Sequence, residues 1–260
     1  AAAVEPLPAR QRRTRLLDDD PPAGALAGRT VEPSVEVASL ELASGLVVHL
    51  KPLPASPERA VVQATWIGGR IEESGTSLGL TAAAALALAG PATRQLPSRD
   101  IRDALAGTSV DLACTVGEDC VSLVLTADPE ELGTALALLS LLLGEPEVEA
   151  PALARWRAAM RDEHRDRGPG LEERLAVTAL ALLTGGDPRF APLAPERAAD
   201  IELAYARRWL DEVLGHAAVE VAVVGPATSA ELEAAVVRGL AGLRRRPASR
   251  PELEPLRRLA

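Results

Sequence analysis

The side chains of this chain best suited to bind a metal or to act as nucleophiles are those of three histidines and two cysteines. His49, His164 and His216 lie far apart in the sequence, and none has a second histidine four positions away, as two zinc ligands on one helix require. Glu163 precedes His164 and could add a carboxylate ligand. A metal site built from Glu163 and the histidines is one hypothesis. Ordinary charged residues on helix surfaces are the simpler interpretation.

The two cysteines, Cys114 and Cys120, flank a predicted turn at residues 116–119. The segments on either side, 110–115 and 120–126, alternate apolar and polar residues in the way that is typical of a β-hairpin. The two thiols could face each other and form a disulfide, or they could remain a pair of buried thiols. Without a nearby pair of histidines they do not indicate a zinc site.

Other chemical motifs are weak. The pattern Gly-x-Ser-x-Gly occurs at residues 75–79, but it does not directly follow a predicted strand, as the strand-to-helix turn of a serine hydrolase nucleophile requires. The sequence has no glycine-rich phosphate-binding motif, so it does not indicate a nucleotide-binding protein. Arg189 and Phe190 are neighbours in a predicted loop, 187–195. Arginine and aromatic side chains are enriched at interface hot spots, so this pair is a candidate contact with a substrate or a neighbouring domain. An ordinary turn is the alternative.

Composition excludes some classes of protein. The chain has 260 residues, 47% apolar and only 2% aromatic, so its core must be built from Ala, Leu and Val. A net charge of −9 argues against nonspecific binding to nucleic acid, which needs a basic surface. The longest strongly apolar stretch, 132–143, is too short to span a bilayer. We expect either a mature exported protein or a piece of a longer one, and the sequence leaves open whether it belongs in the bacterial cytoplasm or in an exported or periplasmic location.

Apolar periodicity and turn residues predict an order of strands and helices. This order, with runs of strands and helices that do not strictly alternate, favours an α+β domain whose mostly antiparallel sheet carries helices on one face. The prolines and opposed charge blocks of residues 1–34 predict a partly disordered arm, 35–243 the folded domain, and 244–260 a second linker. The predicted strands are 35–42, 46–52, 60–67, 110–115, 120–126 and 218–224, and the predicted helices are 77–90, 99–106, 129–143, 150–167, 170–183, 196–214 and 229–243.

The helix predicted at 77–90 is apolar nearly all round, and it follows a strand and a glycine-containing loop. Gly79-Leu80 at its start resembles the entry to the zinc-binding helix of the M16 (insulinase/pitrilysin) peptidases, in which Gly-Leu-x precedes His-x-x-Glu-His. The two histidines would fall on Ala82 and Leu86, and the catalytic glutamate on Ala85. At the family's spacing, the third zinc ligand would fall on Glu163. Alanine and leucine can pack, but they cannot bind an ion or accept a proton.

The resemblance covers roughly 35–243 and implies a two-layer LuxS/MPP-like metallohydrolase fold. It also implies a degenerate, non-catalytic repeat that holds no zinc of its own, binds extended peptide, and completes the chamber of a catalytic M16 domain or subunit. Two alternatives remain at this point. One is a zinc metallopeptidase with relocated ligands, Glu163 and His164. The other is a free-standing interaction scaffold with no role in binding peptides.

Overall fold

The computed structural model describes residues 15–17, 24–54, 59–167, 170–243 and 253–256. Seven described strands form one sheet in the order β1-β2-β3-β7-β4-β6-β5, so that β7, the last of them along the chain, lies at its centre. The pair β3–β7 is parallel, and every other neighbouring pair in this sheet is antiparallel. The strands are β1 (Leu26–Glu32), β2 (Val37–Leu42), β3 (Val47–Pro52), β4 (Ala60–Ile67), β5 (Asp111–Val116), β6 (Cys120–Ala127) and β7 (Val219–Gly225).

The strands form where small and β-branched residues alternate between a buried and a less buried side. In β7, Val219, Val221 and Val223 are buried, whereas the residues between them are half-buried. β4 and β6 show the same alternation along their whole length. One face of the sheet is therefore covered by helices and the other is more open.

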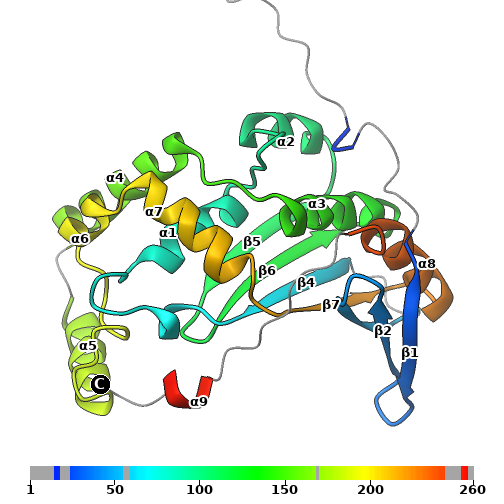
Figure 1. Ribbon diagram of the computed structural model, residues 1–260, viewed down its shortest axis with the longest axis horizontal. Coiled ribbons are helices and arrows are strands. Elements are labelled where there is room, and N and C mark those ends of the chain that lie inside the picture. Colours follow the sequence, from blue (N-terminus) through cyan, green and yellow to red (C-terminus); the bar gives the residue numbers. More distant parts are fainter. Residues whose placement is uncertain (1–14, 18–23, 55–58, 168–169, 244–252, 257–260) are drawn as a thin grey trace, which may run out of the picture.

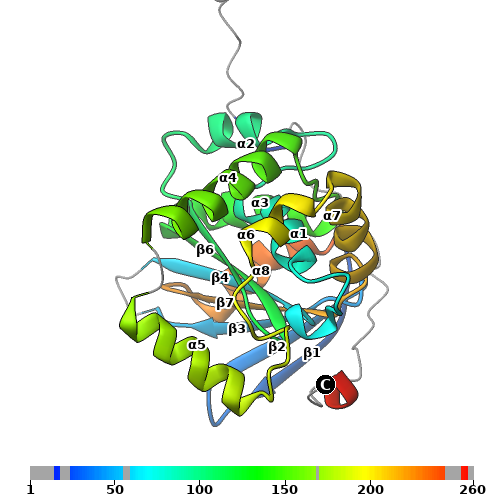
Figure 2. The ribbon, with the colours of Figure 1, turned by 90° about the vertical axis from the view of Figure 1, so that its left-hand side faces the viewer.

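Most of the helices gather on the covered face, with α1, α3 and α8 in contact with the strands, whereas α5 and α9 lie apart from them (Figure 1). The view turned by 90° shows the same two layers, with α5 set apart from the other helices (Figure 2). In the part of the chain that the structure describes, no helix is long and apolar enough to cross a bilayer. The helices and short turns of helix are η1 (Arg70–Glu72), α1 (Leu80–Ala89), α2 (Ser98–Leu105), η2 (Pro129–Glu131), α3 (Leu132–Gly144), α4 (Ala150–Arg167), α5 (Leu171–Leu183), α6 (Pro195–Asp200), α7 (Leu203–Trp209), η3 (Leu210–Leu214), α8 (Ser229–Leu240) and α9 (Leu253–Leu256).

The predicted fold class is confirmed: an α+β domain with a mostly antiparallel sheet and helices on one face. The single helix expected at 196–214 is instead divided, because the backbone leaves the helical region at Ile201, where α6 ends, and α7 begins at Leu203. The helix predicted at 99–106 begins one residue earlier, at Ser98, whose hydroxyl donates to Glu149.

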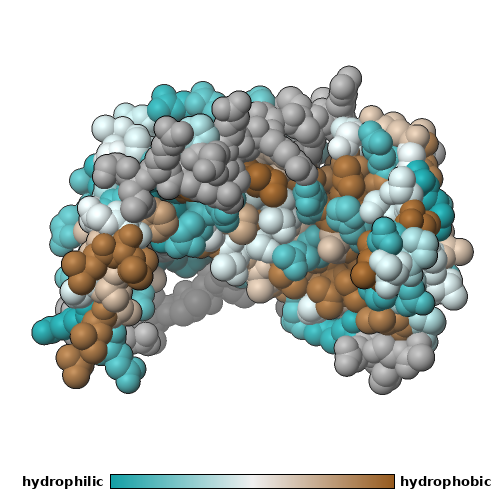
Figure 3. Space-filling view, turned by 90° about the horizontal axis from the view of Figure 1, so that it is seen from below, coloured by the Kyte–Doolittle hydropathy of each residue, from teal (hydrophilic) through white to brown (hydrophobic). Residues whose placement is uncertain are grey.

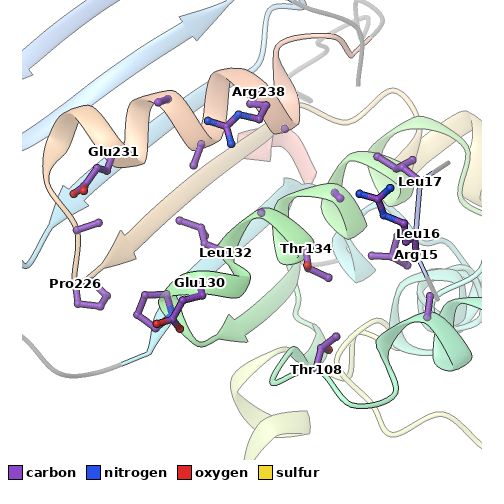
Figure 4. A pocket seen from close by; sticks show the side chains of 18 residues that line it. Arg15, Leu16, Leu17, Thr108, Glu130, Leu132, Thr134, Pro226, Glu231 and Arg238 are labelled. Atoms are coloured by element: carbon purple, nitrogen blue, oxygen red, sulfur yellow. The ribbon is translucent and has the colours of Figure 1, made fainter. Parts of the chain in front are cut away.

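The range predicted to be an N-terminal arm contains folded structure. β1 pairs with β2 as an edge strand, although its residues are mostly exposed. Leu16 is only 6% exposed, and it lines a groove of about 860 Å³ whose other walls are the end of α2, α3 and α8 (Figure 4). The rest of the predicted arm and most of the predicted C-terminal linker lie outside the described residues.

Candidate functional site

The segment between β4 and α1 shapes one end of the helix layer. Gly79 precedes α1 with a φ of 86°, and a Cβ at this position would lie 2.6 Å from Leu193. The backbone conformation therefore favours glycine, and any other residue would also displace the end of the Leu193 side chain. Glu73 is buried, and its two carboxylate oxygens accept hydrogen bonds from the backbone N–H groups of Gly79 (2.9 Å) and Thr81 (2.8 Å). A carboxylate in this place satisfies N–H groups that have no partner inside the helix and favours the positive end of the helix dipole.

The three positions at which the sequence resemblance places zinc chemistry all lie on α1, and none of them carries a donor atom. Ala85 is buried, and Leu86 packs against the core. Ala82 lies at the wall of a pocket.

This pocket has a volume of about 360 Å³ and lies between α1, α4, the end of β5 and the loop that precedes α6. Most of its wall is apolar, and three charged residues stand around it. The apolar side chains include Leu78, Ala82, Val116, Trp156, Met160 and Leu193, and the charged ones are Arg70, Glu73 and Arg197.

The strand β5 ends at this pocket and is an edge of the sheet, with no described strand on its outer side. The N–H of Gly117 donates to the carbonyl of Cys120 (2.8 Å) and closes the β5–β6 hairpin. Hydrogen-bonded and non-bonded pairs alternate along an antiparallel ladder. Leu112, Cys114 and Val116 therefore belong to non-bonded pairs, and their N–H and C=O groups point outward.

The register of this hairpin also answers the question of the cysteines. Cys114 lies opposite Leu123, and Cys120 lies opposite Ile67 of β4, so the two thiols are not cross-strand partners, and both are free. Burial raises the pKa of the Cys114 thiol to about 11. Burial, together with the adjacent Asp119 and Glu118, also raises the pKa of Cys120. Neither thiol is activated as a nucleophile.

The other ligand-type residues do not converge on the pocket. Glu163 and His164 are exposed on α4, and adjacent positions on a helix point in different directions. His49 lies on β3, where its Nδ1 is 2.9 Å from the Ser39 hydroxyl, and His216 is 2.9 Å from the carbonyl of Asp211. Among the residues that the structure describes, no group of three or more His, Cys, Asp or Glu side chains could hold a metal ion.

The residues at the pocket do not fit a zinc ion. Catalytic zinc requires about three nitrogen, sulfur or oxygen ligands from the protein. The pocket offers one carboxylate, Glu73, whose two oxygens already accept backbone N–H groups. The charged groups beside it, Arg70 and Arg197, would repel a cation.

The arginine beside the aromatic residue lies close to this region but is engaged by the chain itself. Arg189 forms a bidentate ion pair with the buried Asp187, and this hydrogen bonding raises its pKa. Its guanidinium also donates to the carbonyls of Ile71 (2.9 Å) and Leu256 (2.7 Å), and it stacks 5.9 Å from the Phe190 ring centroid. The side chain thus joins the loop after α5 to η1 and α9. The binding role of Arg189 and Phe190 stays a prediction.

Burial also affects one acidic group in the loop before α1. Glu72 accepts a hydrogen bond from the Gly69 N–H (3.1 Å), but desolvation has the larger effect and raises its pKa. The ionised form of this carboxylate therefore lowers the stability of the folded state, because the charge is partly buried.

Sequence reasoning did not find two residues of the pocket wall, Trp156 and Met160. A signal for them was present, because the two large apolar side chains stand four positions apart in an otherwise charged helix. That spacing puts them on one face of α4.

Several solved structures with a similar fold are proteases or domains of M16 peptidases. The periplasmic protease PqqL from Escherichia coli matches 96% of this chain with a TM-score of 0.71 and 19% identity, over 27% of its own length. An inactive peptidase M16 domain from Pseudomonas fluorescens matches 82% of this chain with a TM-score of 0.66 and 19% identity, over 52% of its length. The ferredoxin protease FusC, solved as a mutant in complex with Arabidopsis ferredoxin, matches 95% with a TM-score of 0.70 and 18% identity, over 28% of its length.

The chain thus has the M16-like fold that the sequence resemblance implied, and an inactive domain is among the similar structures. It spans between about a quarter and a half of the length of these proteins. No protein-family model matches the sequence, and a search of curated proteins finds no match either.

Proposed function

We propose that this chain is a non-catalytic unit that binds extended peptides and works beside a catalytic zinc peptidase unit of the same fold. The observation that carries the proposal is the free edge of β5 next to a helix, α1, whose metal-binding positions hold Ala82, Ala85 and Leu86. Such a site retains a place for a peptide backbone but has no group that could cleave it.

The mode of binding that this edge supports is strand addition. Outward N–H and C=O groups recur at Leu112, Cys114 and Val116, at the spacing with which a peptide strand pairs. Hydrogen bonds between the two backbones do not depend on the peptide's sequence, so the edge would accept many peptides.

A separate observation favours a partner. The helix α5 exposes five leucines, and their hydrophobic side chains are visible on the projecting arm at the left of Figure 3. Large exposed apolar patches in soluble proteins mark interaction sites. The similar solved proteins are two to four times longer than the part matched, which supports a second unit as the cover. The exposed leucines are Leu171, Leu175, Leu180, Leu182 and Leu183.

The two alternative functions make different predictions. An enzyme with relocated ligands would bind about one zinc per chain, and Glu163→Gln would remove its activity. A scaffold with no peptide role would bind no peptide. We expect the purified chain, incubated with zinc and desalted, to hold almost no zinc and to cleave no peptide. One tightly held zinc per chain would contradict the non-catalytic proposal.

Strand addition can be tested with one substitution at the edge. Cys114→Pro removes an outward N–H but leaves the ladder to β6 intact, and proline is tolerated at such edge positions. Cys114→Ala is the matched control because it keeps the N–H. We expect a fluorescently labelled pool of ten-residue peptides to bind the Cys114→Ala protein as it binds the unmodified protein, and the Cys114→Pro protein at least about 10-fold more weakly.

A second measurement tests strand addition even if the proline variant does not fold. Peptides with N-methylated backbones cannot donate the same hydrogen bonds, so they should bind the unmodified protein more weakly than their parents. Equal binding of methylated and parent peptides would contradict strand addition.

A further inference from the structure

The pocket at α1 stands where a metal ion would act in an active member of this fold, yet its wall is built for a different ligand. Trp156 and Met160 come from one face of α4, and Ala82 opens the space opposite because its side chain is small. A histidine at position 82 would extend into this volume. The loss of the metal-binding residue and the presence of the pocket thus have one structural cause.

The charged groups around the pocket are already occupied. The oxygens of Glu73 accept the N–H groups that begin α1, and Arg70 donates to the carbonyls of Arg189 (2.5 Å) and Ala191 (2.9 Å). Arg197 donates to the carbonyl of Gly75 (3.0 Å). Their role toward a ligand is therefore mainly to exclude: two guanidinium groups disfavour a cationic side chain, and the apolar wall disfavours any unpaired polar group.

The pocket and the peptide edge meet at Val116, which lines the pocket and turns its backbone outward at the end of β5. A peptide strand paired with β5 would pass the mouth of the pocket there. Successive side chains of a strand point to opposite faces, so one side chain at this point would enter the pocket. A volume of about 360 Å³ is at the small end of the range of roughly 300–1,000 Å³ for ligand pockets.

We infer that this pocket selects peptides with one large apolar side chain, of the Leu, Met or Phe class, next to the residues that pair with β5. The inference rests on the proposed strand addition and adds the substrate class. The pocket beside the positions without metal ligands binds an apolar side chain of the peptide. A lysine or arginine at the same position of the peptide is disfavoured.

The test uses the full chain and one labelled host peptide of ten residues, rich in Thr and Val, in which a single central position is Leu, Phe, Ala, Asp or Lys. We expect Leu and Phe to bind about 10- to 100-fold more tightly than Ala, since burying such a side chain contributes roughly 1.5–3 kcal/mol. Asp and Lys should bind no better than Ala. Binding that is strongest with Asp or Lys would overturn the inference.

A pair of variants on α1 locates the effect. Ala82→Leu fills the pocket and should reduce the preference for Leu over Ala to less than about 3-fold, a loss of most of the transfer free energy of the side chain. Ala89→Leu is the matched control, because Ala89 is exposed at the end of the same helix. The control should keep the preference. An unchanged preference in Ala82→Leu would overturn the assignment of the pocket.

A third variant keeps the inference open to test if Ala82→Leu does not fold. Met160→Ala enlarges the pocket from α4 and should shift the preference from Leu toward Phe. Its failure to change the relative affinities of the Leu and Phe peptides would count against the pocket.

The two proposals fail in different ways. If all peptides bind alike and the variants have no effect, strand addition stands and the selective pocket does not. If no peptide binds, the proposed function itself fails.

Discussion

Two helices of this chain are rich in Ala and Leu but have opposite surroundings. Within α1, Ala83, Ala84 and Ala87 are fully buried and Leu88 is 1% exposed. In α5, Leu182 is 80% exposed. The sequences LTAAAALALA and LEERLAVTALALL do not reveal this contrast. An apolar helix has to be covered by something, but its composition does not say whether the cover is its own sheet or another molecule.

The ends of the two helices differ in the same sense. α1 begins after Gly79, and the buried carboxylate of Glu73 accepts the N–H groups of Gly79 and Thr81. α5 begins after Gly170, where no side chain caps the helix. The helix that belongs to the core is held at its start by a side chain of the preceding loop, whereas the other has no side-chain cap. The comparison therefore predicts a difference in local stability.

The largest effect expected is in hydrogen exchange. Amides of α1 should exchange only when the domain unfolds, whereas those of α5 should exchange through local opening, at least about 1,000-fold faster relative to their intrinsic rates. Mass spectrometry on peptic fragments of the free chain would measure this ratio. Equal protection of the two helices would show that α5 is covered in solution, and the contrast between a buried α1 and an exposed α5 would then be wrong.

Removing a leucine from each helix tests the same contrast in stability. Leu88→Ala should lower the free energy of unfolding by about 2–5 kcal/mol, because it leaves a cavity in the core. Leu182→Ala should change it by no more than about 0.5 kcal/mol. Urea unfolding followed by circular dichroism gives both values. A loss of about 2 kcal/mol or more in Leu182→Ala is the cost expected at a buried site. That result would mean that α5 is buried in the fold.

The start of α1 gives a third and smaller effect. Glu73→Ala leaves the N–H groups of Gly79 and Thr81 buried without an acceptor, so we expect a loss of about 1–3 kcal/mol. Glu73→Gln keeps one carbonyl oxygen and should lose less. Glu202→Ala, at an exposed position before α7, is the control and should have little effect. If Glu73→Ala is as stable as the control, Glu73 does not hold the start of α1.

The smallest effect expected is a dependence on pH in the same loop. Burial raises the pKa of Glu72 above its value in the unfolded chain, so the folded state holds this proton more tightly. Ionisation of Glu72 therefore costs stability, and this cost disappears as the pH falls through the raised pKa toward the ordinary value near 4.3. Glu72→Gln should be at least as stable as the unmodified chain at pH 7.

The relative stability of the two proteins should then change with pH. Between pH 7 and pH 4.5 or so, the unmodified chain should gain stability relative to Glu72→Gln. Unfolding midpoints in urea across this range would measure the difference. If the unmodified chain instead loses stability relative to Glu72→Gln as the pH falls, then the hydrogen bond from Gly69, and not burial, controls the pKa of Glu72.

Much of the fold follows from local patterns. The bounds of α4 match the prediction because charged residues surround a single apolar face, and those of β4 match because its alternation is unbroken. The break between α6 and α7 was missed, since Ile201 is apolar and continues the helical pattern while its backbone does not. β1 was missed because its exposed residues carry no alternation and pair only at the edge of the sheet.

The candidate site was predictable only in part. The absence of donors at Ala82, Ala85 and Leu86 can be read from the sequence. The pocket cannot, because Trp156 and Met160 meet Ala82 through the packing of two helices that are some 70 positions apart, and such contacts are set by tertiary structure. The register of Cys114 likewise depends on a turn whose length only the folded hairpin fixes.

The central place of β7 has a consequence for the order in which the chain can fold. Val47 of β3 pairs with Glu220, roughly 170 positions later, and contacts so distant in the sequence slow folding. During synthesis, β3 and β4 emerge long before the strand that joins them. Until β7 arrives, two separate half-sheets present open edges, which is the state most exposed to aggregation. The completed sheet therefore depends on the last quarter of the chain, and the ribosome must release most of the domain before its centre can close.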